Sequence, residues 1–274
     1  MHAIRRSLYL LTLLPILAGC AHTPSGPVQG AAVAQAPRGA LDALGSRVRE
    51  DYRQGYSAAG LLDLLPPVAV HGILANTDLD RDIRDHWQAH WRHADRDRIA
   101  ERFVEVGDYS QNRYALPLYS LGMLAGGYAG RSSDGRLATW SERSLRTNLL
   151  GAPQAWALTY ALGTHRPTVG TSGWQPWNDN DGVSGHSFYG AVPFLTAARM
   201  SDSAGWRYSL FALSTLPGLA RIHINKHYTS QAWLGWAIAF HASGIVARDG
   251  DPGAYSWLLL PGEDGVLLTV SRRF

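Results

Sequence analysis

Two histidines, two arginines and a serine-glycine turn lie in three separated segments of this 274-residue chain. The segments are Arg166-Pro167, Val183-Ser184-Gly185-His186 and Arg221-x5-His227-x3-Gln231. A guanidinium group can bind two oxygens of a tetrahedral oxyanion at once, and backbone amides at a tight turn can bind others. An imidazole can attack the central atom or transfer a proton. These residue types together favour a site that binds phosphate and performs chemistry on it.

In order and spacing the segments resemble the signature of the type 2 phosphatidic acid phosphatase superfamily, which reads K-x6-R-P, then P-S-G-H, then S-R-x5-H-x3-D. Bacterial class A acid phosphatases and vanadium haloperoxidases share that signature. The resemblance covers roughly residues 115–247. It implies an all-α fold, a compact helical bundle of the acid phosphatase and haloperoxidase type. It also implies a phosphatase that needs no metal and no cofactor.

The chain departs from the signature at four positions. Thr159 stands in place of the lysine, Val183 of the proline, Ala220 of the serine and Gln231 of the final aspartate. A glutamine carbonyl can hold one tautomer of His227, but it cannot stabilise a positive charge on the ring. A phosphate-binding protein that has lost catalysis is therefore a second interpretation.

Other residues could supply what these substitutions remove. Asp179 or Asp181 could replace the aspartate if folding brings one of them to His227. Another cation could replace the charge of the missing lysine. The candidates are Lys226, His165, Arg143 and Arg146.

The resemblance implies a role for each matching residue. His227 would be the nucleophile that forms a phosphohistidine, with Gln231 orienting its ring. His186 would protonate the departing alcohol and then activate water, the usual reversal from acid to base. The expected phosphate-binding residues are Arg166, Arg221, Ser184, Gly185, Thr159 and Lys226. Phosphate monoesters or diphosphates, of lipids or of small molecules, are the expected substrates.

Two functions of other classes remain open. A vanadium-dependent haloperoxidase would use the same pocket, with His227 binding vanadate instead of attacking phosphorus. A catalytically impaired envelope lipoprotein would bind phospholipid without turnover.

Elsewhere, His86, His90 and His93 share one helical face that could bind zinc, although the surrounding charges favour a solvated surface. The segment 179–182 is better explained as a polar turn than as a calcium loop.

The first residues have the pattern of a lipoprotein signal. Arg5 and Arg6 precede an apolar run over 8–17, and Leu17-Ala18-Gly19-Cys20 ends it. We expect cleavage of residues 1–19, lipidation of Cys20 and a flexible tether over 20–40; a short membrane anchor is the alternative. Ala21 after the cysteine favours the outer membrane, so the expected location is the bacterial cell envelope, facing the periplasm.

Composition excludes several other classes. Cys20 is the only cysteine, so the mature chain has no internal disulfide and no cysteine nucleophile. The net charge is +3, but the basic residues are spread along the chain beside 22 acidic ones, which argues against a nucleic-acid partner. The expected partners are the phosphate ester and the membrane reached through the lipid.

One helical domain over 41–274 should position these residues, with its core motifs in 159–231. The expected helices are 41–58, 78–106, 113–128, 140–163, 185–199, 205–219 and 229–247. Ser184 should cap a helix, and a loop should separate Arg221 from His227, since six residues of continuous helix would place them about 120° apart. The apolar stretches 149–163 and 232–247 read as buried helices of a bundle, being short for a membrane span.

The C-terminal tail departs from the helical pattern. Apolar runs at 256–260 and 266–270 flank a Pro-Gly turn, which predicts a β-hairpin over 256–271. It could pack against the bundle or form a flap that contacts membrane or substrate.

Trp174 and Trp177 lie in a loop rich in Gly, Pro and Asn, and are candidates for the rim of a pocket for an apolar or lipid substrate.

Overall fold

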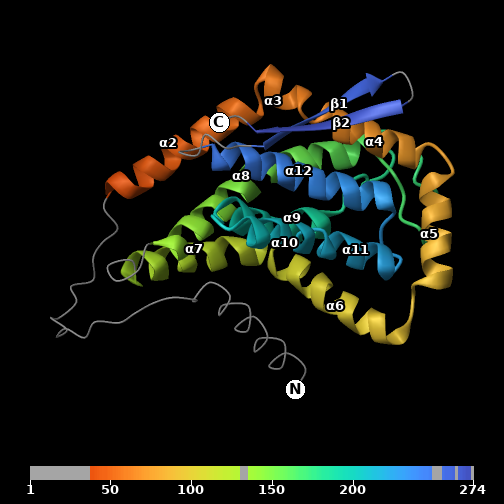
Figure 1. The fold of residues 1–274 in the computed structure, drawn as a ribbon, viewed down its shortest axis with the longest axis horizontal. Coiled ribbons are helices and arrows are strands. Elements are labelled where there is room, and N and C mark those ends of the chain that lie inside the picture. The colour runs from red at the N-terminus through yellow and green to blue at the C-terminus, as the bar shows by residue number, and fades with distance from the viewer. Residues whose placement is uncertain (1–37, 130–134, 249–254, 263–264, 273–274) are drawn as a thin grey trace.

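The computed structural model describes residues 38–129, 135–248, 255–262 and 265–272, and these are largely helical (Figure 1). The predicted lipoprotein signal, Cys20 and residues 20–37 of the predicted tether lie outside the described residues. The helices are α2 (Arg38–Gly55), α3 (Ala58–Leu62), α4 (Leu65–Ala75), α5 (Leu79–His90), α6 (Ala94–Tyr109), α7 (Asn112–Ala129), α8 (Arg136–Leu162), α9 (Gly185–Arg199), α10 (Ala204–Leu213), α11 (Leu216–His223) and α12 (Thr229–Ala247).

The core lies where α9 packs against α8 and α12, in the middle of the bundle (Figure 1). Phe188 and Leu195 of α9 and Leu234 and Ile238 of α12 have no exposed surface. Most residues of α12 are buried, including those on opposite sides of the helix. A helix that is apolar all round belongs in such a position. The stretch 232–247 is therefore an internal helix of the bundle.

Glycine allows the closest approach in this core. A Cβ added at Gly235 of α12 would lie 2.4 Å from the carbonyl oxygen of Ser184. One added at Gly190 of α9 would lie 2.6 Å from Pro217 of α11. The N-terminal half of α9 is thus held against two helices at backbone contact distance.

Two predicted helices were wrong as single elements. The segment 78–106 is broken between α5 and α6, where His93 takes an extended conformation and caps α6. The segment 205–219 is broken between α10 and α11, with Pro217 in the first turn of α11, where proline is tolerated. The sequence analysis also missed α4, whose prolines 66 and 67 lie in its first turn.

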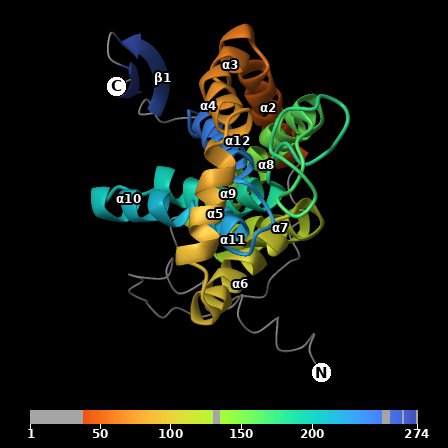
Figure 2. The ribbon, with the colours of Figure 1, turned by 90° about the vertical axis from the view of Figure 1, so that its right-hand side faces the viewer.

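Strands β1 (Tyr255–Gly262) and β2 (Gly265–Arg272) pair antiparallel, with Tyr255 opposite Arg272 and Gly262 opposite Gly265. Within the described part of the chain, one helical stretch, Ala58–Ala75, is long and apolar enough to cross a membrane by length and composition, and 28% of it is buried. Viewed from the side, α10 projects from one flank of the molecule, and the segment joining α8 to α9 lies on the opposite flank (Figure 2).

Candidate active site

The N-terminus of α9 forms one wall of the site. Ser184 is the N-cap, as predicted, and its Oγ accepts a hydrogen bond from the amide of Ser187 at 3.3 Å. Its own amide donates to the carbonyl of Gln231 at 3.0 Å, which ties α9 to α12. A Cβ added at Gly185 would meet nothing within 4 Å, so the first turn of α9 borders open space. Helix N-termini with exposed first-turn amides attract anions.

A short loop between α11 and α12 brings Arg221 and His227 together. The helix α11 ends at His223 and α12 begins at Thr229, so the predicted loop is confirmed. The amides of Lys226 and His227 both donate to the carbonyl of Arg221, at 2.9 and 3.3 Å. Asn225, with φ 56°, makes the sharp reversal that this double contact requires.

The side chain of Gln231 fixes the ring of His227. Its Oε1 accepts from Nδ1 of His227 at 2.9 Å and from the amide of Tyr228 at 3.0 Å. Its Nε2 donates to Oγ1 of Thr164 at 2.7 Å and to the carbonyl of His165 at 2.8 Å. Both ends of the amide are thus satisfied in one orientation only. The proton of His227 lies on Nδ1, and Nε2 keeps its lone pair.

His227 is 3% exposed, and its pKa lies well below the usual range of an imidazole. Its pKa is lowered to about 3, chiefly by burial and then by the charge of Arg221, with smaller contributions from Arg166 and His186. The hydrogen bond to Gln231 opposes this shift in the pKa. These interactions show that the structure brings both predicted arginines and both predicted histidines into one electrostatic neighbourhood.

The two arginines come from separate segments and lie close enough for their charges to interact. Arg221 of α11 is 8% exposed, and its Nε has no hydrogen-bond partner among the described residues. Arg166 donates from Nε to Oδ1 of Asp181 at 2.7 Å. Burial and the charge of Arg166 lower the pKa of Arg221, while Asp108 and Asp181 raise it. A buried guanidinium nitrogen without a partner is costly unless an acceptor binds it, which suits an oxyanion.

The sequence analysis missed Asp108. Its Oδ1 lies 2.8 Å from Nε2 of His186, and the side-chain Nε2 of Gln111 lies 3.4 Å from the same nitrogen. Burial and Arg221 lower the pKa of His186, and the hydrogen bond to Asp108 opposes them. A Cβ added at Gly107 would lie 3.0 Å from Cβ of His186, so the end of α6 packs directly on this residue.

The aspartates offered as substitutes at position 231 have other partners. Asp179 contacts Nδ1 of His165, and Asp181 pairs with Arg166. Both pairs lie in the segment joining α8 to α9, beside the arginine that we expect to bind phosphate. Gln231 itself orients His227, so neither aspartate performs that task.

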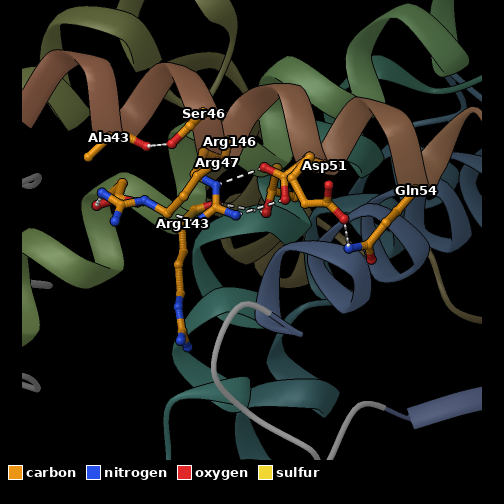
Figure 3. Close-up of polar contacts among 10 residues, drawn as sticks. Ala43, Ser46, Arg47, Asp51, Gln54, Arg143 and Arg146 are labelled. Atoms are coloured by element: carbon orange, nitrogen blue, oxygen red, sulfur yellow. Dashed lines mark hydrogen bonds and ion pairs between the residues drawn. The ribbon is translucent and has the colours of Figure 1, made fainter.

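The sequence also predicted Thr159 and Lys226 as phosphate-binding residues. The hydroxyl of Thr159 donates to the carbonyl of Ala155 within α8, at 2.8 Å. The side chain of Lys226 is exposed on the loop before His227. Of the alternative cations, Arg146 is buried and binds Asp51 through two bonds of 2.7 and 2.8 Å. Figure 3 shows that pair beside α2, with Arg143 pointing away from it.

A buried histidine supports the loop that precedes α9. The ring of His71 binds the carbonyl of Gly182 through Nε2 at 3.0 Å and accepts from Nε1 of Trp174 through Nδ1 at 2.9 Å. Burial lowers the pKa of His71 to about 4. Trp174 is therefore a support of the loop. Trp177, by contrast, is 77% exposed.

The three histidines considered as zinc ligands, His86, His90 and His93, make local contacts at α5 and at the start of α6. Nδ1 of His90 contacts the carbonyl of His86 at 2.9 Å, and His93 caps α6. No group of three or more His, Cys, Asp or Glu side chains that could hold a metal ion occurs within the described ranges.

No protein-family model, no curated protein and no solved structure matches this chain.

Proposed function

We propose that the protein is a metal-independent phosphatase that hydrolyses phosphate monoesters or diphosphates, of lipids first, through a phosphohistidine. The observation that supports this most strongly is His227: a buried, neutral imidazole with its Nδ1 proton held by Gln231. Its Nε2 lone pair is what attack on phosphorus requires. The bundle is, on this proposal, of the acid phosphatase and haloperoxidase type, with the C-terminal hairpin as an appended element.

In the first step Nε2 of His227 attacks phosphorus, and the bond from phosphorus to the ester oxygen breaks. The leaving oxygen takes a proton from His186. The hydrogen bond to Asp108 favours the protonated form of His186. Arg221 and Arg166 bind the phosphoryl oxygens, on which negative charge is spread in the transition state. The first-turn amides of α9 add donors at the positive end of that helix.

In the second step water attacks the phosphohistidine. His186, now neutral, accepts a proton from the water, and the bond from phosphorus to Nε2 breaks. Phosphate leaves and His227 returns to its neutral form. Gln231 gives the ring no counter-charge, so the arrangement favours attack by a neutral imidazole over a long-lived cationic intermediate.

We also propose that residues 1–19 are removed and that Cys20 carries lipid, so that the enzyme works at the surface of the cell envelope. The outer membrane, facing the periplasm, is the proposed location. A lipid anchor brings lipid phosphates to high local concentration, which is why they come first among the substrates.

The test is phosphate release from p-nitrophenyl phosphate and from a panel of lipid phosphates, in the presence of EDTA. We expect His227→Ala to abolish turnover. The matched control is His241→Ala, which removes another buried imidazole, from the interior of α12, and should retain turnover. Quenching at alkaline pH, where a phosphohistidine survives, should trap radiolabelled phosphate on the parent chain and none on His227→Ala.

Three results would refute the proposal: full activity of His227→Ala, loss of activity with EDTA, or no turnover by a folded chain. In the last case, halide oxidation that requires added vanadate would identify the haloperoxidase alternative. Binding of the lipid phosphates without either reaction would identify the non-catalytic alternative.

A further inference from the structure

The outward face of α8 is apolar and exposed. No charged side chain occurs between Arg146 and His165. The inward face of this part of α8 is buried in the core, for example at Leu150 and Gln154. On the outward face, Leu149 is exposed at one end and Trp156 is 68% exposed further along.

Aromatic side chains extend this face at both ends. At one end, Tyr52 and Tyr56 of α2 stack at 5.3 Å, and the hydroxyl of Tyr52 donates to the carbonyl of Leu149 at 2.8 Å. At the other, Trp156 contacts Tyr160 edge-on at 5.1 Å. The amide of Trp177 then donates to the carbonyl of Tyr160 at 2.9 Å. We call this surface the aromatic strip; it consists of Tyr52, Tyr56, Leu149, Trp156, Tyr160 and Trp177.

Trp177 is held in an unusual conformation at the end of the strip. Its φ is 66°, in the left-handed region that costs energy for a residue with a bulky side chain. The indole is 77% exposed, so burial in the core does not compensate for that cost. Such strain at an exposed aromatic residue is expected where the side chain has a partner outside the fold.

We propose that the aromatic strip docks on the surface of a phospholipid bilayer. Tryptophan and tyrosine are the residues that favour the interface between hydrocarbon and water, and the strip has no charge to desolvate. From Leu149 to Tyr160 the outward face of α8 runs about 17 Å, so α8 would lie along the membrane plane.

The position of the strip in the chain selects a membrane over other partners. It begins on α2, the helix that directly follows the segment proposed to carry the lipid anchor. It ends at Trp177, four residues before Asp181, which pairs with Arg166 in the candidate site. Docking would therefore hold the site against the surface to which the anchor leads. The inference rests on the proposed function only for that anchor; the strip itself can be tested without lipid attachment or turnover.

The experiment uses the chain from residue 20 with Cys20→Ser, so that no lipid can be attached. Its binding to vesicles of phosphatidylethanolamine and phosphatidylglycerol, which contain no phosphate monoester, is measured by cosedimentation. The double variant Trp156→Ser/Trp177→Asn removes the two indoles of the aromatic strip, and asparagine tolerates the left-handed backbone. We expect the parent to bind and the double variant to bind at least about tenfold more weakly.

The matched control is Trp206→Ser. Trp206 is 60% exposed, but it lies on α10, on the opposite flank from the segment that contains Trp177 (Figure 2). This control should bind as the parent does, and Trp156→Ser should keep its turnover of a water-soluble ester. The proposal is overturned if the parent does not bind vesicles or if the double variant binds equally well. It is also overturned if the strip instead joins two copies, seen as a dimer that the double variant dissociates without any vesicle binding.

Discussion

At the scale of single residues, the two nitrogens of His227 have different tasks because Gln231 contacts only one of them. The glutamine stands where the resembling signature has an aspartate, and its oxygen lies on Nδ1 at the distance of an ordinary hydrogen bond. An aspartate would in addition stabilise a cationic ring. Burial beside Arg221 already disfavours that cation, so the neutral ring and the neutral partner are consistent with each other.

Spacing in the sequence predicted the histidines and arginines of the site but not Asp108. The motif residues share segments whose separations could be compared with a known signature. Asp108 lies on another helix, 78 positions before His186 in the sequence. No local spacing or periodicity connects the two residues. Nor could spacing settle which way the amide of Gln231 points, since Thr164 and the carbonyl of His165 decide it only after folding.

We expect Asp108→Asn to shift the pH dependence of turnover towards acid. Asp108 raises the pKa of His186 against burial and Arg221, so its removal lowers that pKa. The acid that protonates the leaving group is then lost at a lower pH, and the alkaline limb should move down by about one unit. The measurement is kcat against pH with a soluble ester.

Asp85→Asn is the control for this shift. Asp85 is an exposed aspartate that pairs with Arg84 on α5, and its removal should leave the pH profile unchanged. An unaltered alkaline limb in Asp108→Asn would show that this carboxylate does not act on the catalytic proton.

At the scale of elements, the N-terminus of α9 is positioned by glycines of neighbouring helices. Gly235 of α12 contacts the Ser184 carbonyl, Gly107 of α6 contacts His186, and Gly218 of α11 contacts Ser187. Each contact leaves less room than a methyl group needs. The first turn of α9 is therefore as rigid as the packing of the three helices against it.

Helices with a continuous apolar pattern could be predicted from the sequence, and those with interrupted patterns could not. The segments 185–199 and 229–247 coincide with α9 and α12, whose long apolar runs are buried in the core. The break at His93 has neither proline nor glycine to signal it. The helix α4 was missed because Pro66 and Pro67 read as a breaker, although they begin the helix.

We expect Gly235→Ala to lower both stability and phosphate affinity. The added methyl would lie 2.4 Å from the Ser184 carbonyl and 3.2 Å from the Phe188 amide, so α9 must shift at its first turn. Overpacking of this kind costs about 1–3 kcal/mol of the free energy of unfolding. Urea unfolding and the inhibition constant of inorganic phosphate would measure the two effects.

Gly45→Ala is the matched control, because a Cβ at Gly45 in the exposed helix α2 meets nothing within 4 Å. That variant should be as stable as the parent or slightly more stable, since alanine favours helix. Equal stability and equal phosphate inhibition in both variants would mean that the contact between α12 and α9 does not position the site.

At the scale of the whole molecule, the bundle buries titratable groups that water would otherwise charge. His71, His227 and His241 lie in three different parts of the core, and burial is the largest cause of the lowered pKa of each. Asp80, which accepts from the amide of Ser230 at the start of α12, has a pKa raised by burial. Burial thus disfavours the charged form of each of these four side chains.

This burial makes the fold sensitive to acid. Folded-state pKa values of about 4 for His71 and His241 and about 3 for His227 lie well below the ordinary 6.5. As the pH falls below 6.5, the unfolded chain binds protons that the folded chain does not. The free energy of unfolding should then decrease by up to about 1.4 kcal/mol per pH unit for each histidine until the folded-state pKa is reached. Asp80 acts in the opposite direction, because the folded state protonates it more readily.

His241→Leu isolates one of these contributions. The Nε2 atom of His241 is buried without a hydrogen-bond partner among the described residues, so an apolar side chain of similar size removes the titration without breaking a bond there. Between about pH 4.5 and about pH 6, urea unfolding followed by circular dichroism should show a pH dependence shallower by about 1.4 kcal/mol per unit than that of the parent. Parallel curves for parent and variant would mean that His241 is protonated in the folded state, and that its burial does not exclude the charge.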